Sequence, residues 1–249
     1  MNELKSYILR LADNSLILSH RLAEYSSRGP FLEEDLAISN IALDHLGQAE
    51  LLLRYAAELD GSGKSEDDLA YRRPESEYTN AQLVEQPNTD FAYIIARQYF
   101  VDVYNFFLYD HLKESKDETL GAIAAKAVKE VKYHLRRSSE WVVRLGRGTE
   151  ESHMRIQQAI DDLWMFTGEL FEMADSDKVL LSDGIIPDTA QIRSLWDKHI
   201  DDTFKQANIT KPENTFMISG GREGVHSEYL GHILSDMQYL QRAYPEATW

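Results

Sequence analysis

The sequence contains no cysteine among its 249 residues. Disulfide frameworks, thiol nucleophiles, cysteine-bound zinc and iron–sulfur clusters are therefore excluded. Positive charge is also scarce, since 26 Lys and Arg residues stand against 42 Asp and Glu residues, which gives a formal net charge of −16. Because nucleic acids and anionic membranes are bound through basic surfaces, we expect neither as a partner.

Segments that would direct the chain into or across a membrane are missing as well. No apolar run reaches about 18 residues, the length that a membrane-spanning helix needs. The first residues, Met1–Lys5, do not form a basic region followed by an apolar stretch, so no signal peptide is expected. These absences predict a soluble, cytoplasmic protein.

Proline and hairpin signals are rare, which favours an all-α fold. The chain has six prolines and none between Pro87 and Pro187, so long helices are permitted there. Asp183-Gly184 is the only Asn-Gly or Asp-Gly dipeptide that stands between apolar runs.

The periodicity predicts seven helices, at about residues 4–25, 32–59, 91–113, 118–145, 151–173, 189–207 and 226–244. A polar loop is expected at 62–87, and the short segment 179–186 is expected to form a small hairpin or to cap the bundle. The expected helices at 32–59, 91–113, 118–145 and 151–173 are each longer than 20 residues, so we expect an antiparallel bundle. No linker divides the chain, which predicts a single domain over residues 1–249.

Four of the expected helices carry carboxylates that could line a bundle core. Di-iron carboxylate bundles take a Glu from each of two helices and a Glu-x-x-His from each of two others. The candidate carboxylates, one from each helix, are Asp13, Asp44, Asp102 and Glu130. The pattern requires a histidine three residues after Asp44 and another three residues after Glu130. Gly47 and Tyr133 occupy these two positions, so both histidines are absent. His134 lies four residues after Glu130 and shares its helix face, whereas His45 follows Asp44 directly.

Three interpretations of these carboxylates remain open from the pattern alone. They are core ion pairs or surface acids, a working metal site, or a vestigial metal site. A buried carboxylate without a metal needs a cationic or hydrogen-bonding partner. The cations nearest in sequence are Arg97, Lys126, Lys129 and Lys132.

Two further features have a structural and a functional interpretation. The expected helix 91–113 is rich in aromatic residues, which either fill the core or dock a partner, and Tyr93, Phe100 and Phe107 are the candidates for docking. The glycine-rich segment 220–224 precedes a helix, where backbone N–H groups could bind a phosphate, although a flexible helix start explains it equally. The segment Tyr71–Arg73 is expected at the surface.

Several stretches resemble the non-catalytic, structural subunits of bacterial ring-1,2-phenylacetyl-CoA epoxidases, from end to end and in the same order. The stretches that carry this resemblance are Asp13–Leu22, Leu43–Ala49, Val84–Asn88, Ile95–Phe100, Lys129–Arg136 and Gly220–Gly231. The resemblance implies a ferritin-like four-helix bundle with additional C-terminal helices. It also implies aerobic phenylacetate degradation as the process in which the chain takes part.

The resemblance further implies a division of labour within a multicomponent monooxygenase. A homologous catalytic subunit carries the di-iron centre that activates O₂, and a flavin and iron–sulfur reductase supplies electrons. The subunit that this chain resembles is itself not an enzyme, holds no metal or cofactor, and pairs with the catalytic subunit. The expected helices 32–59 and 91–113 are too apolar for one bundle to bury completely, so we expect the isolated chain to form a homo-oligomer.

The same resemblance implies contacts with the CoA part of phenylacetyl-CoA in two segments. The residues that correspond to them are Glu77, Tyr78, Thr79, Asn80, Val179, Leu180 and Leu181.

Two alternatives belong to other functional classes. One is a self-sufficient di-iron carboxylate oxygenase or ferroxidase, and the residues it would use are Asp13, Asp44, Asp102, Glu130 and His134. The other is an unrelated helical adaptor.

Overall fold

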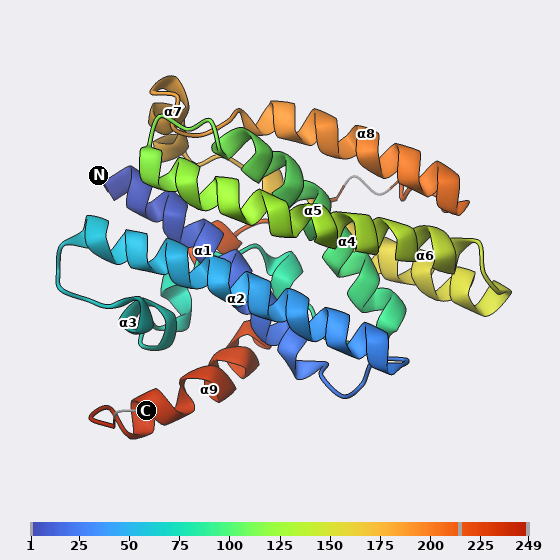
Figure 1. The fold of residues 1–249 in the computed structure, drawn as a ribbon, viewed down its shortest axis with the longest axis horizontal. Coiled ribbons are helices and arrows are strands. Elements are labelled where there is room, and N and C mark those ends of the chain that lie inside the picture. Colours follow the sequence, from blue (N-terminus) through green and yellow to red (C-terminus); the bar gives the residue numbers. More distant parts are fainter. Residues whose placement is uncertain (1, 214–215, 248–249) are drawn as a thin grey trace. The chain divides into compact units, whose positions relative to one another are not determined.

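The computed structural model of the chain describes residues 2–213 and 216–247, which form helices and connecting loops without any strand. The all-α prediction is confirmed, and the helices are consistent with a ferritin-like bundle. Residues 1, 214–215 and 248–249 of the expected domain 1–249 lie outside the described residues. The helices, drawn in Figure 1, are α1 (Asn2–Glu24), α2 (Leu32–Asp60), α3 (Glu66–Tyr71), α4 (Phe91–Leu112), α5 (Glu118–Gly146), α6 (Glu150–Trp164), α7 (Asp175–Ser182), α8 (Thr189–Ala207) and α9 (Glu228–Ala243).

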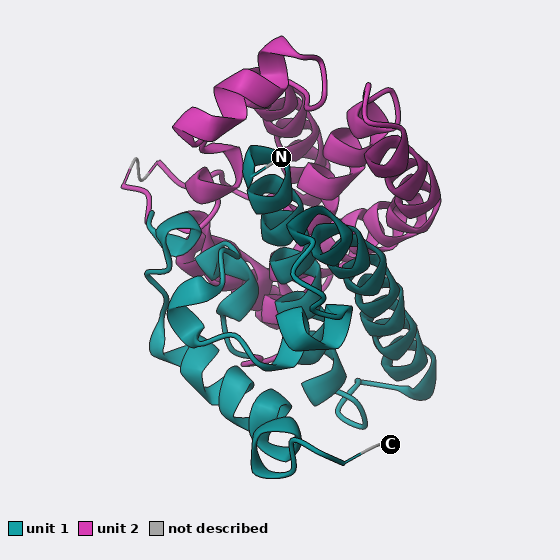
Figure 2. Ribbon diagram, turned by 90° about the vertical axis from the view of Figure 1, so that its left-hand side faces the viewer, with its two compact units in different colours: residues 1–87, 219–249 teal, residues 88–218 magenta. Residues whose placement is uncertain are grey.

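The chain is organised in two compact units, which Figure 2 shows in different colours. Unit 1 consists of Met1–Pro87 and Ser219–Trp249, so it takes both ends of the sequence. Unit 2 consists of the intervening segment Asn88–Ile218.

Unit 1 is built on the helix pair α1 and α2, which lie side by side in Figure 1. Apolar residues at helical spacing explain the packing, because α2 buries Ile38, Ile41 and Leu52 on one face. Gly61 ends α2 in the left-handed conformation with φ 64°, which glycine adopts without steric cost. The 3₁₀ turns η1 (Glu75–Glu77) and η2 (Gln82–Glu85) shape the loop that follows α3.

Unit 2 contains the second pair of long helices, α4 and α5, together with α6, α7 and α8. Asp90 and Asp117 cap the amino ends of α4 and α5 by accepting backbone N–H groups. Gly146 ends α5 where α8 passes closely, since a Cβ at this position would lie 2.3 Å from the Ala207 carbonyl oxygen. Only glycine fits there without a shift of α8.

An aromatic cluster fills the core of unit 2. Phe100 on α4 contacts Trp164, Trp196 and Phe204, with ring centroids 5.8 to 6.4 Å apart. The side chain of Phe100 is fully buried, so of the three aromatic docking candidates this residue belongs to the core. Tyr93 and Phe107 are half-buried.

Three elements differ from the sequence-based prediction. Within the expected loop 62–87, α3 forms because Ser65 and Asp68 make a reciprocal capping box. The helix expected at 151–173 ends at Trp164, and Gly168, a poor helix former, then packs against Met217 in a 3₁₀ turn. The segment expected as a hairpin or cap contains α7 and a turn.

Candidate functional site

Asp13, the first of the predicted metal-site carboxylates, is fully buried in unit 1 and bonded to protein donors. The Arg73 guanidinium donates a hydrogen bond to each of its oxygens. Nη2 donates to Oδ1, and Nη1 donates to Oδ2 at 3.1 Å. Thr79 donates its backbone N–H at 2.9 Å and its hydroxyl at 3.2 Å to the same carboxylate. Arg73 and Asp13 expose 6% and 0% of their side chains, so this is a buried ion pair.

The Arg73 side chain is held in place by the loop that it organises. Its Nη1 donates to the Glu77 carbonyl at 2.9 Å, and its Nε donates to the Leu69 carbonyl. The guanidinium carbon lies 4.2 Å from the centroid of the Tyr78 ring, a cation–π distance. Burial raises the pKa of Tyr78 to about 12, so its hydroxyl stays protonated and donates to the Ala70 carbonyl.

The expected location of Tyr71–Arg73 at the surface is therefore wrong for Arg73. The cations nearest in sequence to the candidate carboxylates do not bind Asp13 either. Three of them are exposed, namely Lys126, Lys129 and Lys132. The fourth, Arg97, is buried and donates to Asn88 Oδ1 at 2.7 Å. The cation that neutralises Asp13 comes from a loop 60 residues later in the sequence.

Glu85 forms a second buried polar cluster in unit 1, which joins the loop after α3 to the segment before α9. Its carboxylate accepts hydrogen bonds from Asn80 Nδ2 at 2.9 Å, from the Ser227 N–H at 2.9 Å and from the Ser227 hydroxyl at 2.6 Å. His226 Nδ1 lies 2.6 Å from Glu85 Oε1, and His226 Nε2 lies 2.9 Å from the Tyr78 carbonyl oxygen.

The protonation state of His226 follows from these partners. A carbonyl oxygen only accepts hydrogen bonds, so Nε2 of His226 donates to the Tyr78 carbonyl. Burial alone would lower the pKa of His226, but the hydrogen bonds to Glu85 and to the Tyr78 carbonyl outweigh it and raise the pKa. The raised pKa favours the imidazolium form, and the hydrogen bonds of His226 fasten the C-terminal segment to the loop.

In unit 2, Asp102 on α4 is a fully buried carboxylate. Ser138 donates its hydroxyl to Asp102 Oδ2 at 2.8 Å, and Gln98 donates to Oδ1 at 2.6 Å. Burial raises the pKa of Asp102 to about 6, an effect that the neighbouring His134 and the two donors only partly offset.

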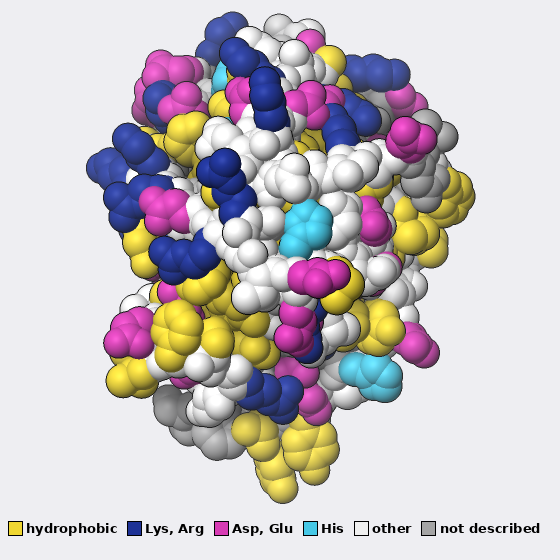
Figure 3. Space-filling view, turned by 90° about the vertical axis from the view of Figure 1, so that its right-hand side faces the viewer, with side chains coloured by type: hydrophobic (Ala, Val, Ile, Leu, Met, Phe, Trp, Pro, Cys, Tyr) yellow, Lys and Arg dark blue, Asp and Glu magenta, His cyan; other side chains and the backbone are white. Residues whose placement is uncertain are grey.

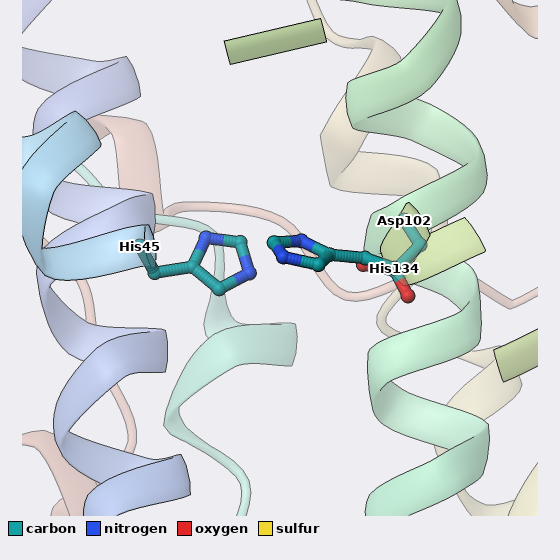
Figure 4. A group of neighbouring side chains, drawn as sticks. All are labelled: His45, Asp102 and His134. Carbon is teal, nitrogen blue, oxygen red and sulfur yellow. The ribbon is translucent and has the colours of Figure 1, made fainter. Parts of the chain in front are cut away.

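His134 on α5 shares this buried region of unit 2. One of its ring nitrogens lies within 4.8 Å of an Asp102 carboxylate oxygen, and Figure 4 shows the two side chains next to each other. The structure therefore brings together two of the residues that the sequence singled out. Figure 4 also labels His45, which belongs to α2 of unit 1 and whose side chain is fully buried.

The other predicted metal-site positions are not buried to the same degree. Asp44 and Glu130 are half-buried. Tyr133 exposes 45% of its surface, and a Cβ built at Gly47 would have nothing within 4 Å. The two positions at which the pattern requires histidines therefore lie toward solvent.

The fit of these residues to an iron pair can be judged at Asp13. A carboxylate that bridges or binds iron needs free lone pairs, and the Asp13 oxygens already accept four hydrogen bonds, two of them from a cation. Arg73 also places a positive charge beside both carboxylate oxygens, and this charge opposes a metal cation there. Asp13 does not fit the role of an iron ligand.

The segment expected to contact CoA lies in the loop organised by Arg73 and Glu85. Tyr78 and Asn80 are fully buried, Thr79 is half-buried, and Glu77 is exposed. In unit 2, Val179 is 54% exposed and Leu180 is buried, both on α7. Beside the loop of unit 1 runs a groove of about 620 Å³, whose lining includes Pro74, Glu75, Leu234, Gln238, Tyr239 and Arg242.

In the part of the chain that the structure describes, no helix is both long and apolar enough to cross a membrane.

Comparison with known proteins gives two findings. A family model described as phenylacetic acid catabolic protein, PaaA_PaaC, matches residues 1–249. The chain is also 48% identical over 249 residues to a protein of Escherichia coli strain K12 that is named as one of the subunits of 1,2-phenylacetyl-CoA epoxidase, a match that covers 100% of both chains.

Proposed function

The chain belongs to the family of phenylacetic acid catabolic proteins, and from this premise we propose that it is a structural, non-catalytic subunit of a phenylacetyl-CoA epoxidase. Its role is to pair with a homologous catalytic subunit in aerobic phenylacetate degradation. The relative from Escherichia coli is named as one subunit of such an epoxidase, which supports membership in a multi-subunit assembly.

The ion pair between Asp13 and Arg73 is the observation that carries the non-catalytic role. It uses a carboxylate of the predicted metal constellation to pair with a buried arginine, whose positive charge opposes the binding of a metal cation at that carboxylate. The exposure of Tyr133 agrees with this role, because a side chain at that position does not lie in a buried cavity.

The di-iron centre of the catalytic subunit supplies the oxygen chemistry in this proposal, and a reductase supplies its electrons. The residues of this chain contribute rigidity. Arg73 and Glu85 fix the loop 73–86 from inside unit 1, and His226 ties the C-terminal segment to that loop. A fixed loop of this kind can hold a substrate or a partner without losing conformational entropy on binding.

We also propose that this loop contacts the CoA part of phenylacetyl-CoA, together with Val179–Leu181 of α7. Glu77 is the loop residue whose side chain is exposed, whereas Tyr78 and Asn80 would contribute through their backbone. Glu77→Lys in the assembled complex is expected to change KM for phenylacetyl-CoA several-fold and to leave kcat unchanged. The same substitution at the exposed Glu58 on α2 is the control, and equal KM values for both variants would contradict the contact.

A self-sufficient di-iron oxygenase or ferroxidase is the second candidate, and one observation favours it. Asp102 and His134 lie within 4.8 Å of each other in a fully buried region, and both are residue types that bind iron. This candidate requires Asp13 as well, whose oxygens are taken by Arg73 and Thr79.

Reconstitution by omission tests the proposal. Phenylacetyl-CoA, NADPH and the reductase are incubated with this chain alone, with the catalytic subunit alone, and with both, and product formation is measured. We expect turnover with both subunits and none with this chain and the reductase. Turnover by this chain and reductase without the catalytic subunit would establish the oxygenase instead.

A further inference from the structure

The outward-facing side of α2 exposes four leucines over its first four turns, and Ser39 and Asn40 are the polar residues among them. Leu32, Leu36, Leu43 and Leu46 are 68%, 53%, 63% and 38% exposed. Their spacing of four, seven and three residues places them on one face of the helix. We call these four residues the leucine stripe. The opposite face of the same turns buries Ile38, Ile41 and Ala42, so this half of α2 carries apolar side chains on two faces.

The second half of α2 gives an internal comparison, because its outward side is charged. Glu50, Arg54 and Glu58 are exposed there, and Arg54 donates to Glu50 at 2.5 Å and to Glu66 at 3.1 Å. A helix side that faces water normally has this polar character. A row of exposed leucines on one helix side is instead typical of a surface that another protein covers.

Gly47 follows the leucine stripe on the same side of α2 and has no explanation within the chain. It lies in the interior of a 29-residue helix, where glycine lowers helix stability. A Cβ at Gly47 would meet nothing within 4 Å, so no neighbour in this chain requires the missing side chain. Glycine is the residue that lets another backbone approach closely.

We infer that the leucine stripe and Gly47 form the surface on which a helix of the homologous catalytic subunit packs, an inference that rests on the function proposed above. Residues 32–46 cover about 21 Å along the axis of α2, enough for several turns of a second helix. The first turns of α2 lie on the right-hand side of Figure 1, which faces the viewer in Figure 3, where hydrophobic side chains are exposed among charged ones.

The charges beside the stripe indicate the chemistry of the partner helix. The first turn of α2 carries Glu33, Glu34 and Asp35, and the whole chain has a net charge of −16. A second copy of this chain would bring the same acids to the contact, whereas a homologous subunit with basic residues at the rim would complement them. The stripe is then the apolar core of a larger interface with a polar rim.

Binding of the full-length chain to the purified catalytic subunit, measured by sedimentation velocity, tests this assignment. Gly47→Arg adds bulk and charge at the contact, yet arginine is a good helix former and has open space around its Cβ. We expect Gly47→Arg and the double variant Leu36→Glu/Leu43→Glu to weaken binding at least about 30-fold, as loss of an interface core does. Gly47→Ala is expected to bind within a few-fold of the wild-type chain.

Met154→Glu is the matched control, because Met154 is an apolar residue of α6 with 58% exposure outside the stripe. This variant is expected to bind like the wild-type chain, and all variants are expected to keep the wild-type helical circular dichroism. Unchanged binding of Gly47→Arg and the double variant would overturn the assignment and leave the proposed function standing. Loss of self-association alone, with normal binding to the catalytic subunit, would show that the stripe binds a second copy. No binding by the wild-type chain would reject the proposed function itself.

Discussion

The substitution Arg73→Met removes the cation that neutralises Asp13 and is expected to destabilise unit 1 strongly. Asp13 would keep the two hydrogen bonds from Thr79 but would be a fully buried charge without a counter-ion. The carbonyls of Leu69 and Glu77 would also lose their donor. Breaking a buried ion pair from one side costs about 3–5 kcal/mol, so we expect a loss of that order in the free energy of unfolding.

The double variant Asp13→Asn/Arg73→Met distinguishes this reasoning from a mere loss of packing. Asparagine keeps an oxygen that accepts from the Thr79 N–H and carries no charge, so nothing ionised remains buried. We therefore expect the double variant to be more stable than Arg73→Met alone, with a coupling energy between the two sites of about 2 kcal/mol or more.

Urea unfolding followed by far-ultraviolet circular dichroism gives both quantities. The slope of the free energy against urea must stay constant across the variants, so that the midpoints report stability. A double variant that is as unstable as Arg73→Met, or less stable, would refute the claim that Asp13 is an ionised group held by Arg73.

Two further predictions concern pH. Because the pKa of His226 is raised in the folded state, its ion pair with Glu85 stabilises the protein fully below about pH 6.5 and is lost as the pH rises through the raised pKa. The stability difference between the wild-type chain and His226→Gln should therefore shrink between pH 6 and pH 9, and a constant or growing difference would contradict the imidazolium. Asp102 has a raised pKa of about 6, so its ionisation opposes folding from about pH 4 upward, by on the order of 3 kcal/mol above pH 6. Asp102→Asn should gain stability relative to the wild-type chain across that range, and no gain would show that the carboxyl is ionised without cost.

Helix positions followed from the sequence because their signals are local. The proline-free stretch and the helical periodicity predicted α4 and α5 within a few residues, and the structure adds that Asp90 and Asp117 cap their amino ends. The early end of α6 was not predicted, because the role of Gly168 depends on its contact with Met217, which is distant in sequence. The short α3 was missed because its capping box stands in a polar segment without helical periodicity.

The buried polar groups were only partly predictable, and for one of them a usable signal existed. His45 follows the apolar residues Ile38, Ile41 and Ala42 at helical spacing, so periodicity places it on the buried face of α2. The metal-site pattern was instead counted from Asp44, which is only half-buried. It therefore followed a different face of α2 from the buried one on which His45 lies.

His134 gives the same lesson on α5. It lies at helical spacing from Val131 and Ser138, which are buried, whereas Tyr133 is off that face and exposed. Spacing from an assumed ligand is therefore a weaker guide than spacing from the apolar face of the helix.

The partner of Asp13 had no such signal. Arg73 lies in the segment Tyr71–Arg73, which reads as surface because charged residues are rarely buried. Its burial depends on a loop that returns to α1 over 60 residues and on Thr79 and Tyr78, which complete its surroundings. Long-range pairing of this kind is not encoded in any local pattern. The same holds for His226, whose partner Glu85 is 141 residues away.

The iron content of the purified subunits tests the central claim most directly. This chain and the catalytic subunit are each loaded with ferrous iron without oxygen, freed of excess metal, and analysed separately and as the sedimenting complex. We predict that the iron of the complex belongs to the catalytic subunit, with far less than one equivalent on this chain. About two equivalents on this chain alone, with the absorption band of an oxo-bridged iron pair after exposure to air, would contradict it.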